Sequence, residues 1–172
     1  MAGKSTPLPG RPPWLGFLPD FLFDVDRRPE RYILKAWLLA LGPSILLSIV
    51  VNLIFHPQTQ PDLRLHGIGD ILLIVVASPV IETFILALVL AGLTRLFSAG
   101  PAAAASAVLW GLAHSSAAPV WGLVVWWPFL VMSIAWLTWL HAGFLRAIFV
   151  TVSIHALQNC FGVLIAVLFG HT

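Results

Sequence analysis

The sequence predicts an all-α integral membrane protein, a polytopic helical bundle of about five transmembrane helices. Apolar residues make up 59% of the 172-residue chain and charged residues only 9%, whereas a soluble domain carries about 25% charged residues. The apolar residues fall into five long runs. In lipid, a helix is the one way in which a single run can satisfy its backbone hydrogen bonds. This composition excludes a secreted disulfide scaffold, a disordered chain and a nucleic-acid-binding protein.

The first 31 residues differ from the rest of the chain. They begin with a Pro- and Gly-rich stretch that lacks the apolar run of a signal peptide and is typical of a flexible tail. From Trp14 onwards, aromatic residues alternate with Asp and Arg, which favours a segment at the level of the lipid headgroups. Residues 1–31 are therefore predicted to be a tail with an interfacial segment.

The five apolar runs predict five helices. The first helix and its polar loop occupy residues 32–67, and the other four helices form a core over residues 68–172. The second helix is long enough to tilt or to kink at Pro79, and the third starts near Pro101, which suits a first helical turn. The runs span approximately residues 33–55, 68–97, 101–118, 121–140 and 147–169.

The basic residues predict the orientation. With five spans, eight of the nine Lys and Arg residues fall on the N-terminal side of the membrane and only Arg64 on the other, which is the positive-inside pattern. We expect a multi-pass protein of the bacterial inner membrane, with its N-terminus in the cytoplasm and its C-terminus outside. The third run is short, and an even number of spans would move the C-terminus to the cytoplasmic side.

Four polar residues inside the apolar runs are the candidate functional residues. Thirteen of the 16 charged residues lie in the first 70 positions, so Glu82 is the only acid in the remainder of the chain. An ionisable side chain in lipid costs roughly 2.5–3.5 kcal/mol and usually faces the protein interior or a water-filled cavity. His155 and Asn159 are four residues apart and share a helical face. The four candidates are Glu82, His114, His155 and Asn159.

These residue types suit hydrolysis of a peptide bond. A carboxyl group in an apolar site is a competent general base near neutral pH, and an imidazole beside it helps to orient water. A second imidazole and an amide can donate hydrogen bonds to the oxyanion. Alternatively, Glu82, His114 and His155 are ligands of a zinc ion with an open position for water. Each residue also has a simpler interpretation as a proton relay, a core histidine or a hydrogen bond between helices.

The order of these residues resembles the CPBP family of intramembrane proteases, which includes CAAX prenyl proteases and bacteriocin-processing, Abi-type proteins. That family carries E-E-x-x-x-R on one helix, F-x-x-x-H on the next and H-x-x-x-N on a later helix. Glu82 matches the first Glu. Trp110 and His114 match the second motif with Trp in place of Phe. The third motif is matched by HALQN at residues 155–159.

The resemblance covers the four-helix core and implies a peptidase without a cofactor. It implies that Glu82 and His114 activate water, and that His155 and Asn159 stabilise the oxyanion. The expected partners are the lipid bilayer and a membrane-associated peptide or protein substrate, and no nucleic acid is expected.

The chain departs from the family pattern at two positions. Thr83 stands where the family has its second Glu, and Ala87 where it has Arg. Loss of both members of an ion pair leaves no unpaired buried charge. We therefore expect the four candidate residues to be intact and the residues that hold them in place to be altered. The alternative is a non-catalytic membrane protein with an immunity, scaffold or proton-relay role. A transporter is disfavoured because the chain has no inverted repeat.

Overall fold

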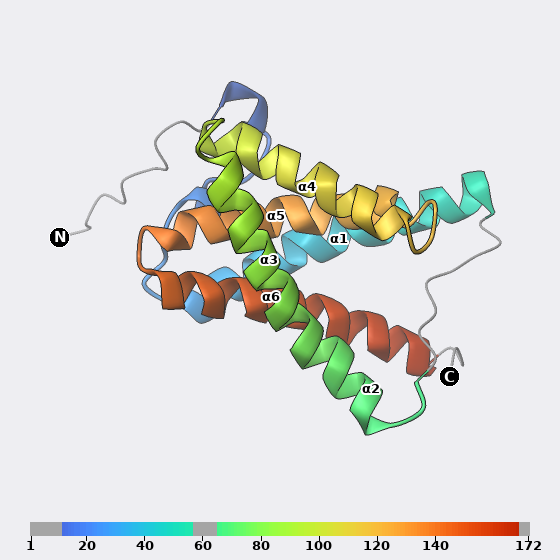
Figure 1. Cartoon of the computed structure of the whole chain (residues 1–172). Coiled ribbons are helices and arrows are strands. Elements are labelled where there is room, and N and C mark those ends of the chain that lie inside the picture. Colours follow the sequence, from blue (N-terminus) through green and yellow to red (C-terminus); the bar gives the residue numbers. More distant parts are fainter. Residues whose placement is uncertain (1–11, 57–64, 169–172) are drawn as a thin grey trace.

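A computed structural model of the chain describes residues 12–56 and 65–168. Within these residues the protein is an all-α bundle of five long helices without strands, as predicted (Figure 1). Four of the five are long and apolar enough to cross a membrane. The five are α1 (Pro29–Phe55), one continuous helix made of α2 (Ile68–Leu72), η3 (Leu73–Ala77) and α3 (Ser78–Leu93), then α4 (Ala99–Ser115), α5 (Gly122–Leu140) and α6 (Phe144–Leu168).

The helix bounds lie close to the predicted ones, with two main differences. α1 begins at Pro29, four residues before the predicted start, because proline has a backbone angle suited to the first turn. The second helix ends at Leu93 instead of residue 97, because the last residues of the run form the turn that leads to Ser98, the extended residue before α4. Three predicted features lie outside the described residues: the tail at 1–11, the loop at 57–64 with Arg64, and the helix end at residue 169.

α4 is the shortest of the five long helices. Its 17 residues rise about 26 Å, whereas the hydrocarbon layer of a bilayer is about 30 Å thick. Figure 1 nevertheless shows α4 running beside α5 between the same two ends of the bundle. The described part of the chain therefore passes five times between these ends, and four of these passes are long and apolar enough to cross a membrane.

Basic side chains gather at one end of the bundle. They belong to the segment that leads into α1 and its first turns, to the turn after α3 and to the first turn of α6, which all lie at the left in Figure 1. The side of the membrane that this end faces stays a prediction. The basic residues among those described are Arg27, Arg28, Arg31, Lys35, Arg95 and Arg146.

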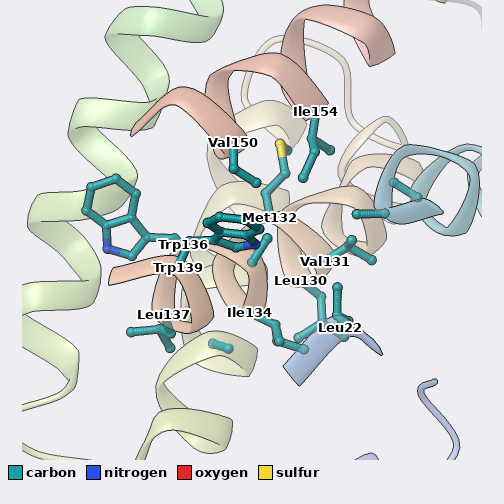
Figure 2. Close-up of a cluster of buried hydrophobic side chains, with 14 of the residues drawn as sticks. Leu22, Leu130, Val131, Met132, Ile134, Trp136, Leu137, Trp139, Val150 and Ile154 are labelled. Atoms are coloured by element: carbon teal, nitrogen blue, oxygen red, sulfur yellow. The ribbon is translucent and has the colours of Figure 1, made fainter. Parts of the chain in front are cut away.

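α5 is the central helix. Every residue from Pro128 to Trp139 is buried, and the helix contacts α1, α4 and α6. In Figure 2, Met132 of α5 reaches toward Val150 and Ile154 of α6. Lipid tails are as apolar as these side chains, so close van der Waals packing, more than exclusion of water, holds such helices together.

α4 and α5 lie in close contact at two glycines, Gly111 and Gly122. A Cβ atom placed on Gly122 would lie 2.1 Å from the backbone oxygen of Gly111 and from Oγ of Ser115. Farther along the same pair of helices, Ser133 Oγ donates a hydrogen bond to Ser106 Oγ at 3.1 Å. Small residues of this kind let helix backbones come together in a membrane, and they hold α4 in a fixed position against α5.

The segment before α1 folds against the bundle. It contains two short 3₁₀ turns, η1 (Pro13–Leu15) and η2 (Asp20–Phe23). The backbone oxygen of Leu22 accepts hydrogen bonds from Tyr32 Oη at 2.9 Å and from Thr138 Oγ1 at 3.0 Å. Part of the predicted interfacial segment is therefore packed into the end of the bundle. Its buried residues are Leu15, Leu18, Leu22 and Phe23.

The shared acceptor leads to a stability prediction. Tyr32→Phe removes one of the two donors, while the ring can keep its edge-on contact with Trp139 at 5.2 Å. We expect the free energy of unfolding in detergent to fall by about 0.5–1.5 kcal/mol, and Thr138→Val to have a similar effect. The double variant should lose more than the sum, because the buried carbonyl of Leu22 then has no donor. Additive losses in thermal unfolding would contradict the shared acceptor.

Candidate functional site

Glu82 lies near the middle of the Ile68–Leu93 helix and faces α6. Its Oε1 atom accepts a hydrogen bond from Ser78 Oγ, one helical turn earlier. Its Oε2 atom is buried and has no hydrogen-bond partner among the described residues. The side chain as a whole is 21% exposed. One carboxyl oxygen is thus held in place, while the other is available for chemistry.

Among the described residues, His155 of α6 is the ionisable group paired with Glu82. Its Nε2 atom lies 3.8 Å from Glu82 Oε2, and its side chain is only 6% exposed. This distance is longer than a direct hydrogen bond, which rarely exceeds about 3.2 Å. The imidazole ring packs edge-on against Phe129 of α5, with the ring centroids 5.5 Å apart. The structure therefore places two of the four predicted residues directly beside each other.

His114, in the last turn of α4, contacts the ring of Phe129, which also contacts His155. Its ring centroid is 5.3 Å from that of Phe129, and its Nδ1 atom is 2.9 Å from the backbone oxygen of Trp110. A carbonyl oxygen only accepts hydrogen bonds, so we assign the proton to Nδ1. In the neutral ring, Nε2 then keeps its lone pair and can accept a hydrogen bond.

Asn159 bonds to the backbone of a neighbouring helix. Its Nδ2 atom donates a hydrogen bond to the backbone oxygen of Ile74, in η3, at 2.9 Å. The predicted role of Asn159 was to donate to an oxyanion. The bond that the structure contains joins two helices, which is the simpler role that the sequence also offered for an amide in a membrane.

The structure adds Phe129 and Ser78 to the site, neither of which the sequence analysis singled out. Phe129 contacts both imidazoles, and Trp110 stacks on its ring at a centroid distance of 4.4 Å with an interplanar angle of 5°. Phe129 lies in an unbroken apolar run, so no local signal distinguishes it from a core residue. Ser78 had a signal, because it lies four residues before Glu82 and therefore on the same face of the helix.

Two further buried hydroxyl groups have no partner in the described part of the chain. Thr83 occupies the position of the second Glu in the family motif, and Thr151 lies one turn before His155 on α6. Both side chains are almost completely buried, and neither Oγ1 atom forms a hydrogen bond there. A neutral hydroxyl group therefore follows Glu82 in the chain, where the motif that the sequence resembles has a carboxylate.

The alternative in which Glu82, His114 and His155 bind zinc is suggested by the sequence alone. In the parts of the chain from 12 to 56 and from 65 to 168, no three His, Cys, Asp or Glu side chains are grouped closely enough to hold one metal ion. Glu82 and His155 are close together, while His114 contacts the ring of Phe129, which also contacts His155.

A separate groove lies between α1, η3 and α6. It is mostly apolar, and the residues that line it on α6 are Ser153, Ala156, Leu157 and Cys160. Successive residues of a helix turn by about 100°, so three of these residues, Ser153, Leu157 and Cys160, lie about 100° or more around α6 from both His155 and Asn159. The groove is therefore distinct from the site around Glu82.

Comparison of the chain with family models, curated proteins and solved structures gives no match. The functional argument therefore depends on the geometry of Glu82 and its neighbours.

Proposed function

We propose that this protein is an intramembrane endopeptidase that hydrolyses a peptide bond of a membrane-associated peptide or protein. The observation that carries the proposal is the buried, unpartnered Oε2 atom of Glu82, 3.8 Å from Nε2 of His155. Ionisable residues in spans are costly and usually functional. The resemblance of three motifs to the CPBP family supports the same activity.

The proposed reaction needs only groups of this chain and a water molecule. Oε2 of Glu82 accepts a proton from water as the water oxygen forms a bond to the peptide carbonyl carbon. His155 donates a hydrogen bond to the resulting oxyanion, and Nε2 of His114 is a second acceptor that orients the water. The carbon–nitrogen bond then breaks, and Glu82 returns the proton to the leaving nitrogen. The products are one new carboxyl group and one new amine.

The test is hydrolysis by the purified protein in liposomes that contain a panel of single-span peptides. In water enriched in ¹⁸O, mass spectrometry should detect two fragments, with one ¹⁸O atom in the new carboxyl group of the N-terminal fragment. Liposomes without protein provide the blank. If no peptide in the panel is cut, the peptidase assignment fails and the non-catalytic function replaces it. Loss of cleavage on chelation, restored by Zn²⁺, would replace the metal-free mechanism with the zinc mechanism.

The non-catalytic function has two observations in its favour. Thr83 and Ala87 replace a Glu and an Arg of the family motif, and the amide of Asn159 is bonded to Ile74. In that case Glu82 and His155 would relay protons or bind a partner protein. Glu82→Gln would then change the response of the protein to pH or its partner binding, with no hydrolysis in either form.

A further inference from the structure

The long helix from Ile68 to Leu93 contains a turn that is not α-helical. η3 is a π-helical segment, in which the N–H of Ser78 donates to the backbone oxygen of Leu73, five residues earlier. Pro79 follows directly and has no N–H group. Such π-turns are rare and occur frequently at functional sites.

The carbonyl group of Ile74 is left without a donor in its own helix. In an α-helix, Ser78 would donate to it, but the N–H of Ser78 is bonded to Leu73. If the π-helix continued, residue 79 would donate to it, but residue 79 is proline. Lipid offers no replacement, because it contains no water in its core. The amide of Asn159 supplies the missing donor at 2.9 Å.

The same π-turn determines where Glu82 points. A residue inserted into a helix rotates everything after it by about 100° relative to everything before it. Ser78, the first residue after η3, donates the hydrogen bond that holds Glu82 Oε1. α6 therefore contacts this helix on both sides of Ser78, through Asn159 at Ile74 and through His155 at Glu82.

We propose that Asn159 is a positioning residue, whose amide satisfies the carbonyl exposed by the π-turn and so fixes Glu82 beside His155. This role differs from donation to an oxyanion, which is the role that the sequence motif implies. The effect on catalysis rests on the proposed function. The effects on stability and on the environment of His155 do not.

A double-mutant cycle tests the hydrogen bond. Asn159→Leu should lower the unfolding temperature by several degrees, about 4 °C or more, because the Ile74 carbonyl then has no partner. Pro79→Ala restores an N–H, so Ile74 gains a donor in its own helix whether that turn stays π-helical or becomes α-helical. In the Pro79→Ala background, Asn159→Leu should therefore lower the unfolding temperature by less than half as much as it does in the wild-type background. Equal losses in the two backgrounds would overturn the proposal.

Gln158→Leu is the matched control for this cycle. It removes an amide from the neighbouring position of α6, where Oε1 of Gln158 has no hydrogen-bond partner. It should leave the unfolding temperature nearly unchanged in both backgrounds. A loss equal to that of Asn159→Leu would mean that any amide on α6 is required, and the specific role of Asn159 would be rejected.

The position of Glu82 is tested by NMR of protein labelled with ¹⁵N in its histidine rings. Glu82→Gln should shift the His155 Nε2 resonance, because the two side chains are 3.8 Å apart. In the Asn159→Leu background this shift should fall by at least half, and an undiminished shift would contradict positioning. Asn159→Leu should also lower kcat by about 10- to 100-fold with KM nearly constant. A lower kcat without changes in the NMR response or the stability cycle would identify Asn159 as an oxyanion donor instead.

Discussion

Glu82→Gln is expected to lower kcat for peptide hydrolysis by about 10²- to 10⁴-fold, the contribution of a positioned general base. Glutamine has nearly the same shape, and its amide oxygen can still accept the hydrogen bond from Ser78. It cannot take a proton from water near neutral pH. The measurement is the single-turnover rate in liposomes, with Glu30→Gln as the control.

Glu30 is a matched control because it and Glu82 are the only glutamates of the chain. Glu30 lies in the first turn of α1, and its replacement should leave the rate within about twofold of the wild type, as for an exposed substitution away from the site. The unfolding temperature of Glu82→Gln should be unchanged or higher, since a neutral amide is cheaper to bury than an ionisable carboxyl group. Full activity of Glu82→Gln in folded protein would end the assignment.

Gly122→Ala is expected to be the most destabilising addition of a single methyl group among the described glycines. The new Cβ would lie 2.1 Å from the backbone oxygen of Gly111 and from Ser115 Oγ. The serine side chain can rotate, but a backbone oxygen moves only with its helix. We expect the free energy of unfolding to fall by about 1–3 kcal/mol, as for other overpacked sites. Because His114 lies between Gly111 and Ser115 on α4, its contact with Phe129 should also be disturbed.

Two other glycines provide the comparison for Gly122. Gly111→Ala places its Cβ 3.2 Å from the backbone oxygen of Gly122 and should be milder, while Gly162 of α6 has no heavy atom within 4 Å of a new Cβ. Gly162→Ala should stabilise the helix by up to about 1 kcal/mol. Thermal unfolding of the three variants should therefore rank Gly122→Ala lowest and Gly162→Ala highest. Equal behaviour of Gly122→Ala and Gly162→Ala would contradict the close approach of α4 and α5.

The helices were predictable because lipid limits an apolar run to one regular structure. The bounds that differed did so where local geometry decides, as at Pro29, where a proline outside the apolar run begins α1. The π-turn was only partly predictable. Pro79 indicated an interruption of the helix, but its partner, Asn159, lies 85 positions from Ile74. No local pattern identifies a donor from another helix.

The candidate site shows the same limit. The scarcity of charged residues in the spans identified Glu82, and helix spacing put His155 on the face of Asn159. Which of these groups come together depends on how each helix is rotated about its axis, and an inserted π-turn changes that rotation. Phe129 was not predictable, since its role comes from contacts with two histidines on different helices.

The short length of α4 has a consequence for the surrounding bilayer. Its residues Val108, Leu109 and Leu112 are exposed, so acyl chains must cover a helix of about 26 Å, while the 27-residue α1 presents about 40 Å to the same membrane. This hydrophobic mismatch is relieved when the lipids beside α4 thin locally, at a modest free-energy cost per ångström. Such thinning would bring the headgroup layer closer to His114, which lies in the last turn of α4.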